Sequence, residues 1–198
     1  VQFAYHDLPE KLVPYDYDAF KAQSSEFFVT VSNLESGRAE YIKIKDMLAD
    51  IDYLRASSSL PYFSKIVALD GKKYLDGGCC DGIPIKAFRD MGYKKNVIVL
   101  TRHDGYIKKQ EHGLFAKLMY RKYPNFVDSL LRLHERYNQT LEYIRELEKN
   151  GEVFVIRPSV ELTIGRMEHD AQKVRSVYDI GVSDAEKQIA ELKKWLDK

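Results

Sequence analysis

An Asp-Gly pair stands between two short runs that are rich in β-branched and apolar residues. The runs cover residues 65–69 and 72–76, and Asp70-Gly71 joins them. Both central residues of the tightest hairpin turn need positive φ, which Asp and Gly tolerate, so this stretch predicts a two-stranded hairpin. Such a hairpin would bring Asp76 to the end of its second strand, directly before a pair of glycines.

Strand and helix patterns alternate along the rest of the chain. We expect residues 1–20 to be irregular and to lead into a short helix. Short β-rich runs predict strands at 26–33, 39–45, 96–101 and 152–157. Helical spacing of apolar residues predicts helices at 46–58, 84–88, 114–123, 126–149 and 167–198, with a capping box at Ser183 and Glu186 that opens the last segment. This alternation is typical of an α/β fold with a largely parallel sheet.

Composition indicates an ordinary globular protein. With 198 residues, of which 44% are hydrophobic and 31% charged, residues 1–198 are expected to form a single domain. The net charge of +1 lacks the basic excess of a nucleic-acid-binding protein. The two cysteines, Cys79 and Cys80, are adjacent, and a disulfide between neighbours is strained, which favours a reducing, cytoplasmic location.

Asp76 is the candidate catalytic residue. Consecutive glycines after a strand allow a sharp turn and a close approach of the backbone. An acid at that turn lies where open α/β sheets place their ligands, so Asp76 is a candidate general base. By pattern alone, a turn aspartate that accepts backbone N–H bonds is the commoner case.

The residues around Asp76 form an ordered series. Arg55-Ala56-Ser57-Ser58-Ser59-Leu60-Pro61 is followed by the hairpin, by Tyr74-Leu75-Asp76-Gly77-Gly78, by Asp81-Gly82-Ile83-Pro84-Ile85, and by the run at 97–102. In order and spacing this series resembles the patatin-like phospholipase family, most closely its bacterial branch. The resemblance extends more loosely over residues 15–181. It implies a three-layer α/β/α sandwich, of which this chain would be the carboxy-terminal part, incomplete at the amino-terminal side.

The resemblance also implies an activity. Patatin-like enzymes hydrolyse acyl esters of lipids with a Ser-Asp dyad and no cofactor, and the motif position of the family's aspartate is Asp76. Neither their glycine-rich oxyanion segment nor their G-x-S-x-G nucleophile motif occurs in these 198 residues. We therefore expect an esterase when the missing motifs are present and an inactive chain without them. The alternatives are a non-catalytic binding or regulatory domain on the same scaffold and, less favoured, a thiol-dependent activity at Cys79 or Cys80.

Other candidate sites have simpler interpretations. The histidines His6, His103, His112, His134 and His169 lack metal-site spacing, so no metal is expected. The basic, aromatic-containing stretch at 117–123, with Lys108 and Lys109 before it, would suit peripheral contact with anionic lipid headgroups. The favoured alternative is a solvated helix whose Leu118, Met119 and aromatic residues pack inward.

Overall fold

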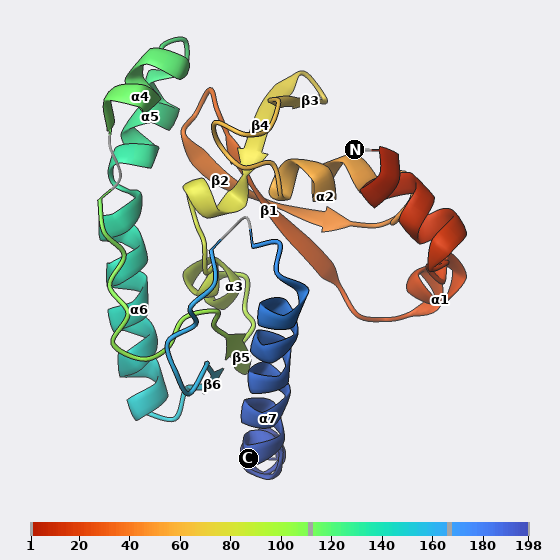
Figure 1. Cartoon of the computed structure of the whole chain (residues 1–198), viewed down its shortest axis with the longest axis vertical. Coiled ribbons are helices and arrows are strands. Elements are labelled where there is room, and N and C mark those ends of the chain that lie inside the picture. The colour runs from red at the N-terminus through yellow and green to blue at the C-terminus, as the bar shows by residue number, and fades with distance from the viewer. Residues whose placement is uncertain (1, 111–112, 166–167, 198) are drawn as a thin grey trace. The chain divides into compact units, whose positions relative to one another are not determined.

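The computed structural model describes residues 2–110, 113–165 and 168–197, which mix helices and strands as an α/β fold requires. The chain divides into two compact units (Figure 1). The first unit takes residues 1–84 and 109–137, and the second takes 85–108 and 138–198. The expectation of a single domain over 1–198 stays a prediction.

The first unit contains a four-stranded sheet of order β2-β1-β4-β3. Its strands are β1 (Phe27–Asn33), β2 (Arg38–Ile44), β3 (Val67–Leu69) and β4 (Lys72–Asp76). The predicted hairpin is confirmed, because β3 pairs antiparallel with β4 and the turn residues Asp70 and Gly71 have φ of 49° and 75°. β4 also pairs antiparallel with the central strand β1, with Asp76 opposite Val31.

The prediction of a largely parallel sheet is wrong for this larger sheet, in which every pairing is antiparallel. For two of these pairings the physical reason is the length of the connections: β1 joins β2, and β3 joins β4, through turns too short for the crossover that parallel strands need. In the second unit, β5 (Asn96–Val99) and β6 (Val153–Ile156) pair in parallel, and helices separate them along the chain.

Short helices complete the first unit. They are η1 (Phe3–Leu12, a π-helix), α1 (Tyr17–Ala22), α2 (Ile51–Ser57), η2 (Gly77–Cys79, a 3₁₀ turn), α4 (Gly113–Met119) and α5 (Pro124–Leu131). The helical segment at Phe3–Leu12 corrects the irregular amino-terminal stretch expected from the sequence. Leu34, Leu75, Cys79, Tyr120, Phe126 and Val127 form one buried cluster that joins the sheet and the turn after β4 to α5.

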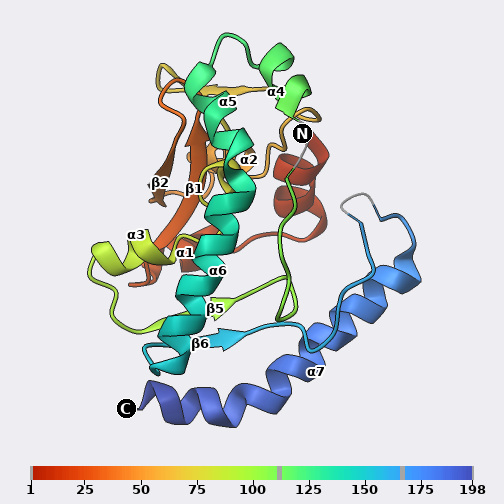
Figure 2. The same ribbon diagram turned by 90° about the vertical axis from the view of Figure 1, so that its left-hand side faces the viewer.

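The helix predicted at 126–149 is two helices. α5 ends at Leu131, its C-cap residue Arg132 has φ of −94° and ψ of 3°, and α6 (Leu133–Lys149) follows directly (Figure 2). Pro124 opens α5 at its first turn, where a missing N–H costs nothing. α6 starts in the first unit and continues in the second.

The second unit also contains α3 (Ile85–Asp90) and α7 (Ala171–Leu196). α7 is continuous through Ser183, so the predicted capping box is wrong; Asp170 caps the helix by accepting the N–H groups of Gln172 and Lys173. Val1, His112 and the two ends of the helix predicted at 167–198 lie outside the described residues. The α3 helix ends at Asp90, and Gly92, two residues beyond, has a φ of 99° that fits the predicted stop.

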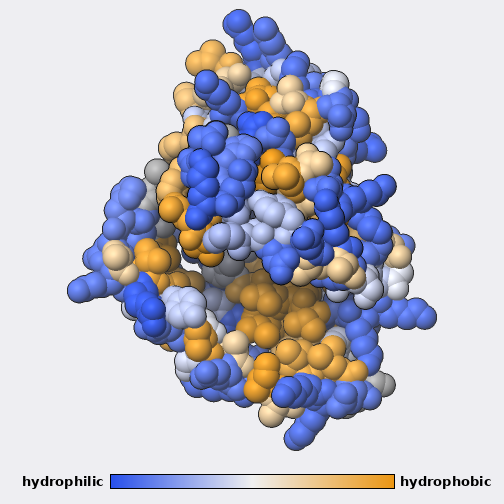
Figure 3. Space-filling model, turned by 90° about the vertical axis from the view of Figure 1, so that its right-hand side faces the viewer, coloured by the Kyte–Doolittle hydropathy of each residue, from blue (hydrophilic) through white to orange (hydrophobic). Residues whose placement is uncertain are grey.

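None of the described helices is long and apolar enough to cross a membrane. Apolar side chains nevertheless reach the surface in several places, and the orange areas of Figure 3 show this for one face. The most exposed in the first unit are Phe63 and Leu114, at 74% and 84%.

Candidate active site

The backbone of Asp76 is held on three sides. Its N–H donates to the Ser59 carbonyl oxygen at 2.9 Å, and its own carbonyl oxygen accepts the Ser32 hydroxyl at 2.8 Å. On the side of β1, it sits opposite Val31 in the antiparallel ladder. The two neighbours that precede it, Tyr74 and Leu75, are 1% and 0% exposed. The end of β4 is therefore a rigid support for the partly buried carboxylate.

The Asp76 carboxylate caps the glycine turn. Its Oδ1 accepts the N–H of Gly78 at 2.7 Å, and Asp76 is the N-cap residue of the 3₁₀ turn η2. Gly77 lies so close to β1 that a Cβ there would be 2.1 Å from the Thr30 carbonyl oxygen. Only glycine fits this contact, so the glycine pair fixes the direction in which the chain leaves the aspartate.

Two buried serines next to this turn use their hydroxyls for structure. Ser32 is 0% exposed and donates to the carbonyl oxygens of Asp76 and, at 3.3 Å, Gly77. Ser59 is 6% exposed and donates to the Arg55 carbonyl oxygen at 2.7 Å. Each hydroxyl proton is committed to a backbone acceptor, as expected of a structural serine rather than a nucleophile.

Arg136 of α6 clamps the other end of the turn. Its Nη2 donates to the carbonyl oxygens of Cys79 at 2.7 Å and Ser129 at 2.8 Å, and its Nε donates to that of Cys80 at 3.2 Å. A planar guanidinium can serve several acceptors at once, which a lysine cannot do with the same geometry. Arg136 thus ties the turn after Asp76 to the junction of α5 and α6.

The α5 helix holds the turn between β1 and β2. The Ser129 hydroxyl donates to the Gly37 carbonyl oxygen at 2.5 Å, and Asn125 Nδ2 donates to that of Glu35 at 2.9 Å. Gly37 has φ of 65°, and a Cβ there would lie 2.3 Å from the Asn125 carbonyl oxygen. These contacts join α5 to the strands that flank Asp76.

Glu40 anchors β4 to β2 through side chains. Its carboxylate accepts from Tyr74 Oη at 2.8 Å, Asn33 Nδ2 at 2.7 Å and Lys72 Nζ at 3.0 Å. Burial works to raise the pKa of Glu40, but the hydrogen bonds from Lys72, Tyr74 and Asn33 outweigh it and lower the pKa. Burial and the Glu40 carboxylate both raise the pKa of Tyr74. The network keeps the hairpin in register.

The cysteines beside the turn are structural in this arrangement. Cys79 is 4% exposed within the buried cluster, and the Cys80 thiol donates to the Gly37 carbonyl oxygen at 3.4 Å. Cys80 itself is only partly buried. Within the described ranges, no three His, Cys, Asp or Glu side chains are grouped to hold a metal ion.

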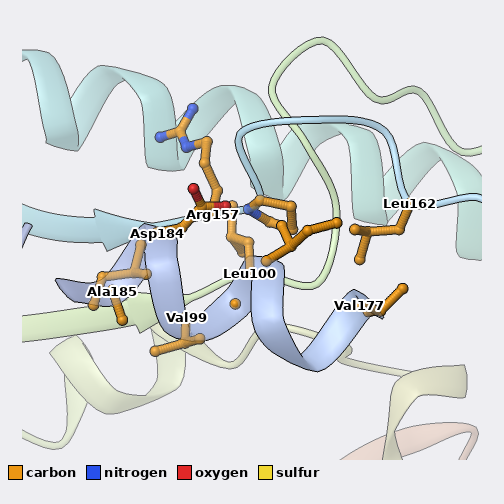
Figure 4. A pocket seen from close by; sticks show the side chains of 11 residues that line it. Val99, Leu100, Arg157, Leu162, Val177, Asp184 and Ala185 are labelled. Atoms are coloured by element: carbon orange, nitrogen blue, oxygen red, sulfur yellow. The ribbon is translucent and has the colours of Figure 1, made fainter. Parts of the chain in front are cut away.

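A small apolar cavity of about 180 Å³ lies in the second unit (Figure 4). Its walls include Val99, Leu100, Leu162 and Val177. Its two charged lining residues are engaged elsewhere: the Arg157 guanidinium points away from the cavity, toward Glu148 and Asp104, and Asp184 accepts the Ser159 N–H at 2.8 Å, which lowers the pKa of Asp184. The cavity offers apolar volume without a catalytic group.

Replacing Arg136 with Met is expected to lower the free energy of unfolding by about 2–4 kcal/mol, because three carbonyl oxygens lose a charged donor. Arg136→Lys should lower it less. Urea unfolding of the 198-residue chain measures both variants. An unchanged unfolding midpoint in Arg136→Met would show that the clamp does not contribute.

Asp76 was predicted from the sequence, but the residues that support it were not. Arg136, Ser129 and Asn125 belong to no motif in the sequence.

Comparison with known proteins adds two family matches. Residues 17–89 match the family described as patatin-like phospholipase, and residues 123–197 match a domain of unknown function, DUF6363. An Escherichia coli (strain K12) protein named "Uncharacterized protein YjjU" is 44% identical over 52 residues. That alignment covers 26% of this chain and 15% of the Escherichia coli protein. The first match contains the hairpin and Asp76, whereas the second contains Arg136.

Proposed function

Through residues 17–89 this chain belongs to the patatin-like phospholipase family, and on that premise we propose that it contributes the base of a Ser-Asp dyad that hydrolyses carboxylic esters of lipids. The observation that carries the proposal is the placement of Asp76, which stands at the end of β4 with its carboxylate held by the Gly78 N–H at 2.7 Å. No cofactor is needed for this chemistry.

The proposed reaction has two halves. A serine hydroxyl attacks the ester carbonyl carbon, Asp76 takes the hydroxyl proton, and the oxyanion forms; the intermediate then expels the alcohol, which leaves with that proton, and an acyl-serine remains. Water next attacks the acyl-serine and gives a proton to Asp76. The serine oxygen then leaves with this proton, and the fatty acid is released.

Fixed placement is what Asp76 has to provide. A free aspartate, with a pKa of about 3.9, is a weak base for a serine hydroxyl, so proton transfer depends on a short and direct contact. The hairpin, the glycine turn and the hydrogen bond to Ser59 restrict where the carboxylate can lie. A general base held in this way loses little entropy when the serine approaches.

The serine of the proposed dyad comes from polypeptide outside these 198 residues. The proposal rests on the missing G-x-S-x-G pattern and on the structural use of the Ser32 and Ser59 hydroxyls. The rival function is a binding or regulatory domain that uses the same scaffold without turnover.

A comparison of two polypeptides tests the proposal. One is the 198-residue chain, and the other carries the same residues after a segment with the glycine-rich and G-x-S-x-G motifs. The longer polypeptide should hydrolyse short-chain nitrophenyl esters, and the 198-residue chain should give only the background rate. Turnover by the 198-residue chain would contradict the proposed source of the serine. Specific lipid binding without turnover by the longer polypeptide would favour the rival.

A further inference from the structure

One side of α4 is fixed to the core of the first unit. Ala116 of α4 and Tyr120, which directly follows α4, are 2% and 3% exposed, and the Tyr120 ring packs edge-on against Phe126 at 5.2 Å between centroids. The Tyr120 hydroxyl oxygen accepts the N–H of Tyr62 at 2.9 Å. These contacts set the rotation of α4 about its axis and so decide which of its residues face outward.

The outward side of α4 is apolar. Leu114, Phe115, Leu118 and Met119 are 84%, 54%, 70% and 50% exposed. The sequence favoured an inward position for Leu118 and Met119, and that expectation is wrong, because Ala116 and Tyr120 take the inward positions instead. Four adjacent exposed apolar side chains on one short helix indicate an interaction surface.

A neighbouring turn adds to this surface. Tyr62 packs its ring against Phe115 at 5.1 Å, and its φ of 71° is unusual for a bulky residue. Phe63, the next residue, is 74% exposed. The strained backbone of Tyr62 is thus directly followed by the solvent-exposed phenyl ring of Phe63.

The charged residues within the two segments that carry these apolar side chains have one sign. Residues 60–69 and 113–127 contain no Asp or Glu, although the whole chain is nearly neutral at +1. Their cations Lys65, Lys117, Arg121 and Lys122 are all exposed. Exposed apolar side chains bordered by cations have the chemistry of a surface that binds at the headgroup level of a membrane.

We propose that the α4 surface, made of Phe63, Leu114, Phe115, Leu118 and Met119 with these four cations, docks onto an anionic lipid bilayer. The apolar side chains enter the boundary between headgroups and acyl chains, while the cations contact the lipid phosphates. The proposal is independent of the role of Asp76, because it concerns binding and not turnover. For an enzyme that hydrolyses lipid esters, this binding would bring the protein to the bilayer that contains its substrate.

Vesicle cosedimentation of the 198-residue chain tests the proposal. Binding should be at least about tenfold stronger to vesicles of phosphatidylglycerol and phosphatidylcholine than to phosphatidylcholine alone, and it should weaken as salt is raised. The double variant Leu114→Asp/Leu118→Asp should lose binding, and Lys117→Glu/Arg121→Glu should lose the preference for anionic vesicles. Circular dichroism checks that each variant is folded.

Matched variants on α7 separate the α4 surface from general effects. Val174→Asp/Tyr178→Asp also replaces two exposed apolar residues, and Lys193→Glu/Lys194→Glu makes the same change of charge. Both should bind vesicles like the unaltered chain. The proposal is overturned if the unaltered chain does not bind anionic vesicles, or if Leu114→Asp/Leu118→Asp binds them equally well. It is also overturned if that variant only dissociates an oligomer seen by gel filtration.

Discussion

Asp76→Asn is expected to reduce kcat for ester hydrolysis about a thousandfold or more in the polypeptide that carries the serine motif. The amide has the shape of the carboxylate, and its oxygen can still accept the Gly78 N–H, so the turn should remain in place. The amide cannot take the serine proton, however, and the loss should therefore appear in kcat. Steady-state kinetics with a nitrophenyl ester measures the effect.

Asp81→Asn is the matched control for this change. Asp81 lies in the same glycine-containing segment, and its carboxylate accepts Tyr41 Oη at 2.6 Å and the Ile83 N–H at 3.3 Å. The amide oxygen can still accept the Ile83 N–H, and the amide N–H can donate to Tyr41 Oη in place of accepting from it, so this variant should retain most of the activity. If Asp76→Asn and Asp81→Asn reduce kcat equally, both carboxylates support the structure of the turn, and Asp76 is not the base.

Gly77→Ala is expected to lower the free energy of unfolding by about 3 kcal/mol. The new Cβ would lie 2.1 Å from the Thr30 carbonyl oxygen in β1, and neither strand can move without breaking the ladder that holds Asp76. Urea unfolding followed by circular dichroism measures the change.

Gly181→Ala makes the same chemical change where space is open. Gly181 lies inside α7, and a Cβ there meets nothing within 4 Å. Because alanine favours the helix over glycine, this variant should be more stable by about 0.5–1 kcal/mol. Similar shifts of the unfolding midpoint in both glycine variants would contradict the steric explanation for Gly77.

Local patterns predicted the part of the site that depends on local chemistry. Asp70-Gly71 adopts the positive φ values that its hairpin needs, and Asp76 ends β4 as its position before the glycines indicated. The family resemblance that these motifs carried agrees with the match at residues 17–89. The catalytic role of Asp76 itself stays a prediction.

Contacts between distant residues were not predictable in the same way. Arg136 reaches carbonyl oxygens 56 and 57 positions earlier in the chain, and nothing in its own helix distinguishes it from other arginines. The break at Arg132 was missed because apolar spacing continues across it. The orientation of Leu118 depends on which side of α4 the core takes, and a short helix with apolar residues all round leaves that choice to tertiary packing.

The segment that matches the domain of unknown function, residues 123–197, contributes hydrogen bonds to the support of Asp76. This match contains Asn125, Ser129 and Arg136. The side chains of these residues donate hydrogen bonds to the carbonyl oxygens of Glu35, Gly37, Cys79 and Cys80. All four acceptor residues lie within the patatin-like match at 17–89. The start of the domain of unknown function is therefore part of the unit that supports Asp76.

A crystal structure of the serine-containing polypeptide tests the central claim most directly. A carboxylate oxygen of Asp76 should lie about 2.6–3.2 Å from the Oγ of the serine in the G-x-S-x-G motif, since direct proton transfer requires a hydrogen bond. If that serine instead pairs with another base while the Asp76 side chain faces open solvent, the proposed dyad does not exist.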